Sequence, residues 1–200
     1  MKNRFTMFFL FALIVAVYSL PAFPQQKGGK GKTSPVEQGK HIVMTFGMCN
    51  DCHTPKIMTP KGPVLDTTRI LSGHRSDEKL PEVPAGIIGP DKWGAVCSND
   101  FTAWYGPWGT TFTANLTPDV ETGLGSWTEE MFIKAMRTGK HMGEGRDILP
   151  PMPWFNLAPL SDHELKSIFA FLHSLKPISN AVPEPISPTG EKVPTPHKKQ

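Results

Sequence analysis

Three segments of the chain repeat apolar positions with helical spacing, and each begins at a good capping residue. In the first, Ser34 is followed by Pro35 at the first helical position and by Glu37 at the third, the arrangement of a capping box. The apolar pattern stops at Gly47, a residue type that commonly ends helices. The sequence therefore predicts a helix over 34–46.

Two more helices are expected in the second half of the chain. One begins at Ser126, with Glu129 three residues on, and ends near Gly139. The other begins at Ser161, where Glu164 completes a second capping box, and stops before Pro177. Its apolar residues follow the i, i+3, i+4, i+7 spacing of a single stripe: Leu165, Ile168, Phe169 and Leu172.

Residues 54–107 show little helical periodicity and contain much glycine and proline. We interpret them as irregular loop, of the long kind that carries function or wraps a ligand. The patterns together predict an all-α fold with long irregular loops. Because a few short helices bury little apolar surface among themselves, we expect a large apolar group at the centre.

The two ends of the chain have their own patterns. Lys2 and Arg4 precede an apolar run from Phe5 to Val17, and Ala22 follows, the layout of a secretory signal peptide over 1–22. An uncleaved membrane anchor is the alternative, although the run is shorter than the ~20 residues that span a bilayer. The polar segment 23–33 is expected to be a linker, and the proline-rich tail 179–200 to be extended over the surface or disordered.

Composition narrows the class of protein. The chain has 200 residues, of which 38% are hydrophobic and 20% charged, enough for one domain with a packed core. Cleavage of residues 1–22 would remove two of the 21 basic residues and none of the 18 acidic ones, which lowers the net charge from +3 to +1. Such a balance gives no reason to expect nucleic-acid binding. Three cysteines are too few for a disulfide scaffold.

Two of those cysteines belong to the segment Cys49-Asn50-Asp51-Cys52-His53, which has the CxxCH pattern of c-type haem attachment. Residues i and i+3 share a helix face, so both thiols can reach the two vinyl groups of one porphyrin, with His53 as the proximal iron ligand. A redox dithiol or half of a zinc site are the alternatives. The first lacks a thioredoxin-like context, and the second lacks another ligand pair.

Met152 is the expected second axial ligand. It lies between prolines in Leu149-Pro150-Pro151-Met152-Pro153-Trp154, which stiffen the backbone and can present the thioether with little reorganisation. Met142 is the second choice, whereas Met131 and Met136 have the helical spacing of core residues. The distal nitrogen of His53 is expected to bond a backbone carbonyl, near Pro60 or Pro63.

The sequence resembles the periplasmic monohaem c-type cytochromes, close to the cytochrome c subunits of dehydrogenases. The matching motifs span about 34–180 in order. They are Gly39-Lys40-His41-Ile42-Val43, Cys49 to Pro55, Asn115-Leu116-Thr117-Pro118-Asp119, Glu121 to Trp127, Arg137-Thr138-Gly139-Lys140, Pro151-Met152-Pro153 and Ala170 to Leu175.

The resemblance implies a helical cytochrome c fold over 34–178, in which His53 and Met152 bind the iron. It also implies that the first and last helices cross, with Gly39 allowing a close approach to aromatics such as Phe171. Asn115 and Thr117 are expected to bond a haem propionate or to line the methionine side.

One stretch departs from the family pattern. Residues 71–107 are expected to be a loop insertion, and they bring Cys97 and a cluster of aromatic residues: Trp93, Trp104, Tyr105 and Trp108. The aromatics are expected to cover the haem or pack in the core, with a partner-docking surface as the alternative. Cys97 is expected to be buried and inert, with a reactive or intermolecular thiol as the alternative.

These features predict a periplasmic electron carrier with one covalent haem c, its iron bound by histidine and methionine. It would pass single electrons between a donor dehydrogenase and an acceptor, and it would touch a membrane only if the N-terminal segment is uncleaved. The alternative is a haem enzyme that acts on a small sulfur compound or peroxide through an open or labile sixth position.

Overall fold

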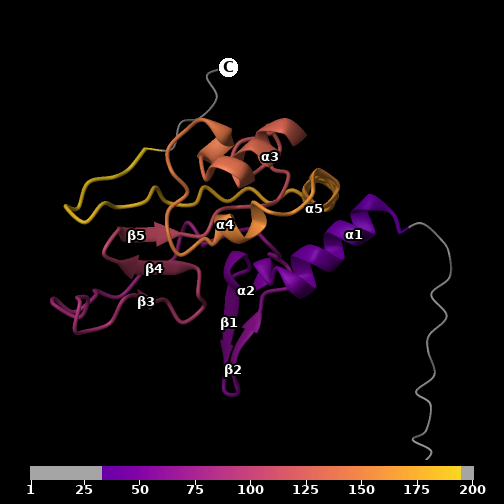
Figure 1. Ribbon diagram of the computed structural model, residues 1–200. Coiled ribbons are helices and arrows are strands. Elements are labelled where there is room, and N and C mark those ends of the chain that lie inside the picture. The colour runs from indigo at the N-terminus through magenta and orange to yellow at the C-terminus, as the bar shows by residue number, and fades with distance from the viewer. Residues whose placement is uncertain (1–32, 195–200) are drawn as a thin grey trace, which may run out of the picture. The chain divides into compact units, whose positions relative to one another are not determined.

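The computed structural model of the protein describes residues 33–194 (Figure 1). The signal peptide expected over 1–22 and nearly all of the linker lie outside the described residues. The first and the last secondary-structure elements along the chain are helices. They are α1 (Pro35–His41), η1 (Ile42–Phe46), α2 (Cys49–His53), α3 (Glu129–Thr138), η2 (His141–Gly143), α4 (Trp154–Leu157) and α5 (Asp162–His173).

Short strands occupy the middle of the chain. β1 (Lys56–Thr59) and β2 (Gly62–Leu65) pair antiparallel as one hairpin, with Ile57 opposite Val64. A second antiparallel sheet has the order β3 (Val96–Cys97), β4 (Ala103–Gly106) and β5 (Gly109–Phe112). Both sheets are drawn in purple and magenta in Figure 1.

The expectation of an all-α fold was therefore wrong, because the structure is a mixed α and β fold. Within the segment interpreted as irregular loop, four short stretches form β1 to β4, whereas β5 lies just beyond it. The strands have at most four residues each, too few to show a period of two. Pro60 and Pro107 lie in the two-residue turns 60–61 and 107–108, where they are compatible with hairpins, and Pro63 lies within β2 opposite Met58.

The expected helices are otherwise present. Ser34 and Ser161 each complete the predicted capping box, and α1 continues through the π-helical turn η1 to Phe46. The middle helix begins two residues later than expected, because the hydroxyl of Thr128 rather than that of Ser126 caps it. It ends at Gly139 in the left-handed conformation, as predicted.

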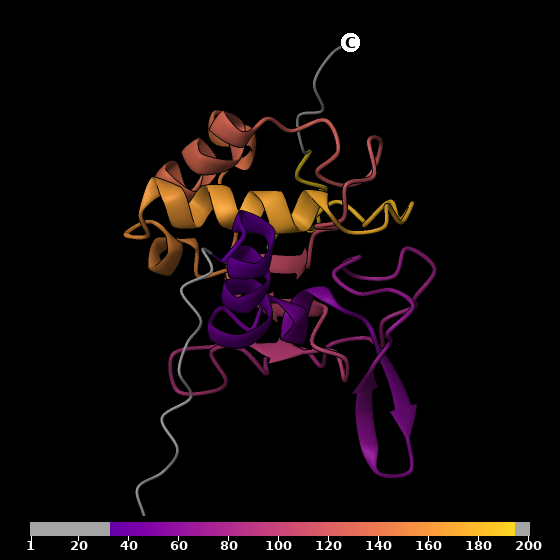
Figure 2. The same cartoon turned by 90° about the vertical axis from the view of Figure 1, so that its right-hand side faces the viewer.

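The core lies where α1 crosses α5 (Figure 2). Gly39 of α1 lies so close to α5 that a Cβ there would fall 1.8 Å from the carbonyl oxygen of Ser167 and 2.8 Å from Cβ of Phe171. The close approach expected at Gly39 is thus confirmed. The buried apolar cluster at this crossing comprises Val43, Leu71, Leu124, Phe132, Ala135, Met136, Leu165, Ile168, Phe171 and Leu172.

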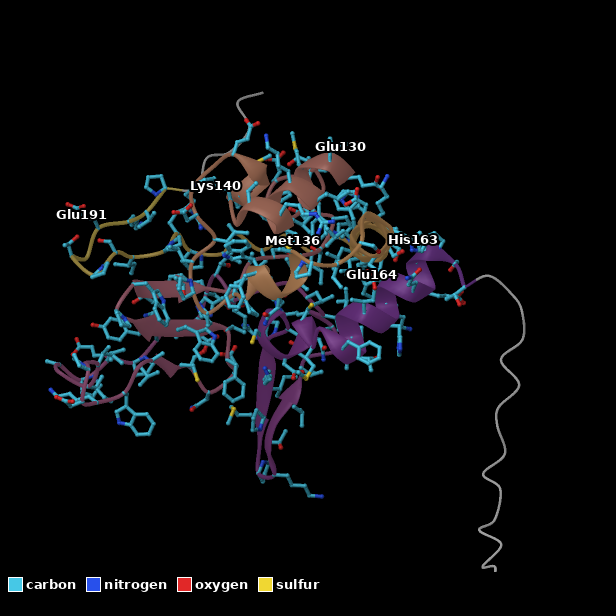
Figure 3. All side chains as sticks on the ribbon, viewed as in Figure 1. Glu130, Met136, Lys140, His163, Glu164 and Glu191 are labelled. Carbon is cyan, nitrogen blue, oxygen red and sulfur yellow. The ribbon has the colours of Figure 1, made fainter. Side chains whose placement is uncertain are left out.

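Met136 and Glu130 of α3 illustrate which side chains lie in this core and which lie at the surface. Met136 is 7% exposed and belongs to the core, as its helical spacing predicted. Figure 3 shows it inside the helical layer, whereas Glu130 lies at the edge of the molecule. None of the helices formed by the described residues has the length and apolar character that a membrane span requires.

The described part of the C-terminal tail is fixed against the body of the protein. Asn180 is 3% exposed, and its side-chain amide donates to the carbonyl oxygens of Ser72 (2.7 Å) and His74 (2.8 Å). Further along, Ile186 and Thr110 of β5 exchange two backbone hydrogen bonds of 2.8 Å. The tail then turns at 187–190, so that Ile186 also lies opposite Lys192, and these anchoring contacts were not foreseen from the sequence.

Candidate haem attachment site

The helical turn α2 carries both cysteines of the CxxCH motif and its histidine. Met48 precedes it in the left-handed conformation (φ 46°) and turns the chain away from η1. Cys49 and Cys52 are half-buried, unpaired and three residues apart on the helix, so that both thiols share a face. Burial raises the pKa of Cys49 to about 11 and also raises the pKa of Cys52. Both thiols are therefore protonated at neutral pH.

The imidazole of His53 is held in one tautomer. Its side chain is buried, and Nδ1 lies 2.8 Å from the carbonyl oxygen of Ala114. Because a carbonyl oxygen only accepts, Nδ1 carries the proton, and Nε2 keeps its lone pair. Burial lowers the pKa of His53, so the ring is neutral at neutral pH. A neutral imidazole oriented through Nδ1–H is the form that binds a metal ion.

The expectation of a backbone carbonyl as partner of His53 is confirmed, but the residue was wrong. Pro60 and Pro63 belong to the β1–β2 hairpin, which extends away from α2 (Figure 1). The acceptor comes instead from a segment 61 residues away, just beyond β5. Nothing in local spacing indicates such a long-range contact.

The segment 71–74 connects His53 to residues 113–114, which follow β5. The backbone N–H of Gly73 donates to the carbonyl oxygen of His53 (2.8 Å), and that of His74 donates to Thr113 (2.9 Å). Gly73 has φ 77°, and a Cβ there would lie 2.5 Å from the carbonyl oxygen of Thr113. Only glycine fits this position, which the sequence analysis did not single out.

Asn115 and Thr117 are buried just after residues 113–114 and bond to protein groups. The Asn115 amide donates to Thr122 Oγ1 (3.2 Å) and to the carbonyl oxygen of Ile178 (2.8 Å). Its Oδ1 accepts from the backbone N–H (3.0 Å) and the hydroxyl (2.7 Å) of Thr117. These bonds fix the loop that follows Ala114. That these two residues also contact a haem stays a prediction.

Met152 is half-buried, two residues before α4, and follows a cis peptide bond between Pro150 and Pro151. The hydroxyl of Thr111 in β5 donates to the carbonyl oxygen of Pro150 (2.8 Å). The short segment 111–114 therefore contacts both the methionine loop and, through Ala114, the ring of His53. In the described residues, this segment is the link between the two expected iron ligands.

Two features of the described residues suit a large apolar group that carries carboxylates: an uncovered apolar surface next to Cys49, and buried polar atoms without a hydrogen-bond partner. Phe46 and Met48 are 72% and 58% exposed next to Cys49, an apolar surface with no protein cover. Four buried side-chain polar atoms in the segment 69–113 have no hydrogen-bond partner. They are Arg69 Nε, Ser72 Oγ, Trp108 Nε1 and Thr113 Oγ1. The residues present thus fit a haem, whose macrocycle is apolar and whose propionates accept hydrogen bonds.

Other residues considered from the sequence take different places. Cys97 is exposed, so the expectation that it is buried was wrong; its position on the two-residue edge strand β3 leaves the thiol uncovered. Trp93 is 66% exposed and is therefore not a core residue, whereas Trp104, Tyr105 and Trp108 are half-buried. Trp108 packs against Gly106, where a Cβ would lie 2.6 Å from the indole ring.

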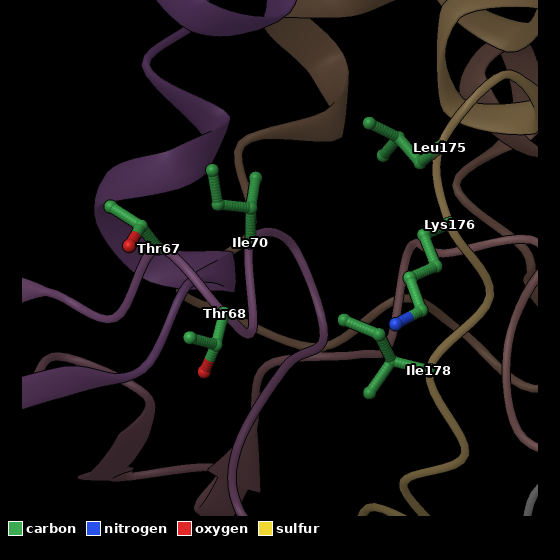
Figure 4. Close-up of a pocket in the computed structure, with 6 residues that line it drawn as sticks. All are labelled: Thr67, Thr68, Ile70, Leu175, Lys176 and Ile178. Atoms are coloured by element: carbon green, nitrogen blue, oxygen red, sulfur yellow. The ribbon is translucent and has the colours of Figure 1, made fainter.

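A separate open pocket of about 440 Å³ lies between the loop after β2 and the chain after α5 (Figure 4). The residues that line it are Thr67, Thr68, Ile70, Leu175, Lys176 and Ile178. It contains none of the expected cofactor-binding residues. Lys176 is the one charged residue in this lining and the pocket is wide open, so the lining does not indicate a particular ligand.

Comparison with known proteins finds relatives among the cytochrome subunits of dehydrogenases. The chain is 40% identical over 74 residues, 36% of its length, to the cytochrome c subunit of the quinone-dependent alcohol dehydrogenase of Gluconobacter oxydans. It is 36% identical over 87 residues, 40% of its length, to the cytochrome c subunit of gluconate 2-dehydrogenase of Pantoea cypripedii. The matched part of the chain is related to the cytochrome c subunits of dehydrogenases.

This relationship to cytochrome c supports the resemblance noted from the motifs and implies haem c as cofactor. The cytochrome subunit of fructose dehydrogenase of Gluconobacter japonicus is also 33% identical, over 79 residues and 39% of the chain. The chain spans only 15%, 20% and 16% of the length of these three relatives. No protein-family model matches the chain.

Proposed function

We propose that the protein is an exported c-type cytochrome that carries one haem and passes single electrons between a dehydrogenase and an acceptor. The observation that carries the proposal is the state of His53. Its Nδ1–H bond to Ala114 leaves Nε2 unprotonated, on the same helical turn as two protonated thiols. An imidazole beside a CxxC pair is the donor set that c-type haem requires.

Each residue of the site has a defined task. Cys49 and Cys52 would tether the porphyrin through two thioethers, and His53 would bind the iron. Met152 would supply the second protein ligand, and a thioether ligand raises the reduction potential. When bound, the haem supplies a centre that changes by one electron. The protein holds the ligands in place through Ala114 and Thr111, so that little rearranges between the two states.

The proposal of one haem rests on the cysteines. With three cysteines in the sequence, Cys49 and Cys52 supply one CxxCH motif, and Cys97 cannot form another. Export is proposed from the signal peptide expected over 1–22.

A partner surface lies beside the attachment site. The hairpin that follows α2 exposes Ile57 (52%) and Val64 (48%) as a cross-strand pair. We propose that a dehydrogenase docks on this apolar surface. Since the mature chain is almost neutral, long-range charge steering would contribute little to docking.

The test is the optical spectrum of the purified protein in both redox states, with and without carbon monoxide. We expect low-spin spectra and no carbon monoxide binding by the reduced protein at neutral pH. Met152→Ala should give a high-spin ferric form and bind carbon monoxide, whereas Met142→Ala should behave as the wild type. A wild-type protein that binds carbon monoxide at neutral pH would instead support the haem enzyme, and an effect confined to Met142→Ala would reassign the ligand.

A further inference from the structure

A second group of ligand-type side chains lies outside the CxxCH site. His74, Glu78 and Asp100 each place one ligand atom within 4.8 Å of the other two. His74 and Glu78 lie in the segment after Gly73, and Asp100 lies in the loop before β4. None of these three residues takes part in the proposed electron transfer.

Hydrogen bonds fix the tautomer of His74. Its side chain is 1% exposed, and Nδ1 lies 2.7 Å from Thr102 Oγ1. That hydroxyl donates its one proton to Asp100 Oδ2 (2.7 Å), so towards His74 it can only accept. Nδ1 therefore carries the ring proton. Nε2 keeps a lone pair, and no hydrogen bond to it is present among the described residues.

Asp100 is equally well positioned. It is 5% exposed, and its Oδ1 accepts from Ser98 Oγ (2.6 Å) and from the backbone N–H of Thr102 (3.2 Å). Neither its carboxylate nor that of Glu78 forms an ion pair with a lysine or arginine of the described residues. The nearby ammonium of Lys56 donates to the backbone carbonyl oxygen of Asp100 (2.6 Å), not to its carboxylate. A metal ion is one way to neutralise the two carboxylates.

We propose that His74, Glu78 and Asp100 bind one divalent transition-metal ion, with Zn²⁺ the best match. One imidazole and two carboxylates suit zinc, whereas calcium prefers oxygen ligands alone. Ligand atoms of a tetrahedral zinc site are about 3.3 Å apart. The three groups would have to close by at most about 1.5 Å, which the exposed side chain of Glu78 can provide. A fourth position would remain for water.

The surrounding contacts resemble those that orient metal ligands elsewhere. A ligating histidine usually donates its other ring N–H to an oxygen. With Nε2 of His74 on the metal, Thr102 would be that acceptor, and the Thr102 hydroxyl in turn donates to Asp100. The same hydroxyl thus orients two of the three ligands. This arrangement separates the group from a chance cluster of surface acids.

The experiment measures zinc bound to the chelator-treated, haem-loaded protein by equilibrium dialysis and elemental analysis. Glu78→Gln removes one ligand at an exposed position, so the fold should persist. Glu82→Gln, an exposed acid on the same loop, is the matched control. We expect one zinc per chain, binding weakened by about tenfold or more in Glu78→Gln, and no change in Glu82→Gln. X-ray absorption should show nitrogen or oxygen ligands at about 2.0–2.1 Å.

Three results would overturn the proposal: no stoichiometric zinc, equal affinity in Glu78→Gln and the wild type, or a sulfur ligand at about 2.3 Å, which would point to Cys97. Because the readout is zinc itself, it does not depend on the electron-transfer function.

Discussion

The close packing of α1 against α5 can be tested by adding a single methyl group at Gly39. Gly39→Ala adds a methyl group that would lie 1.8 Å from the carbonyl oxygen of Ser167, 2.5 Å from its carbonyl carbon and 2.8 Å from Cβ of Phe171. Ordinary contacts begin at 3.4 Å, so the two helices would have to separate by about 1.6 Å. The nearest atoms belong to backbone and cannot move aside as a flexible side chain can.

The expected cost follows from two opposing effects. Overpacking a core costs about 1–3 kcal/mol, and a displacement of this size belongs at the upper end. Alanine regains about 1 kcal/mol over glycine in a helix interior. We therefore expect a net loss of about 2 kcal/mol, equivalent to a fall in Tm of about 4–8 °C for a domain of this size.

Thermal and denaturant unfolding followed by circular dichroism measures the effect. Gly94→Ala is the control, because a Cβ there meets nothing within 4 Å. Its stability should remain within about 0.5 kcal/mol of the wild type. If Gly39→Ala were as stable as Gly94→Ala, the close crossing would be refuted.

Two further predictions concern polar contacts. The Thr68 hydroxyl donates to Asp66 and holds the pKa of that carboxyl below its usual 3.8, so the bond stabilises the fold above about pH 4 and less in stronger acid. In denaturant unfolding at pH 6, the Thr68→Val variant should therefore have a lower free energy of unfolding than the wild type. This difference in free energy should shrink below pH 3, and a difference independent of pH would contradict the prediction. Asn180→Ala leaves two buried carbonyl oxygens unpaired and should cost about 2–4 kcal/mol, whereas the exposed Asn156→Ala should cost less than about 0.5 kcal/mol. Equal unfolding midpoints for these two variants would show that Asn180 does not anchor the tail.

Local signals in the sequence predicted much of the helical part. The capping boxes at Ser34 and Ser161 involve residues three apart, and both helices begin where those patterns place them. The motif Cys49–His53 likewise carries its chemistry within five consecutive residues. The contact at Gly39 was foreseen only through the family resemblance, because no spacing relates it to Phe171.

The remainder depends on contacts between distant residues. Short strands with prolines at their turns resemble irregular loop, so the two sheets were missed. Ala114 holds His53 from 61 residues away, and only the need for a carbonyl was predictable. The pairing of His74 with Asp100 through Thr102 likewise requires the fold.

Covalent attachment of haem at Cys49 and Cys52 is the central claim, and the intact mass of the denatured protein tests it most directly. The protein would be produced together with haem-maturation machinery. We predict a mass increase equal to one haem that survives denaturation and disappears in the double variant Cys49→Ala/Cys52→Ala. A protein without added tetrapyrrole, or with a haem that is lost on denaturation, would contradict the account.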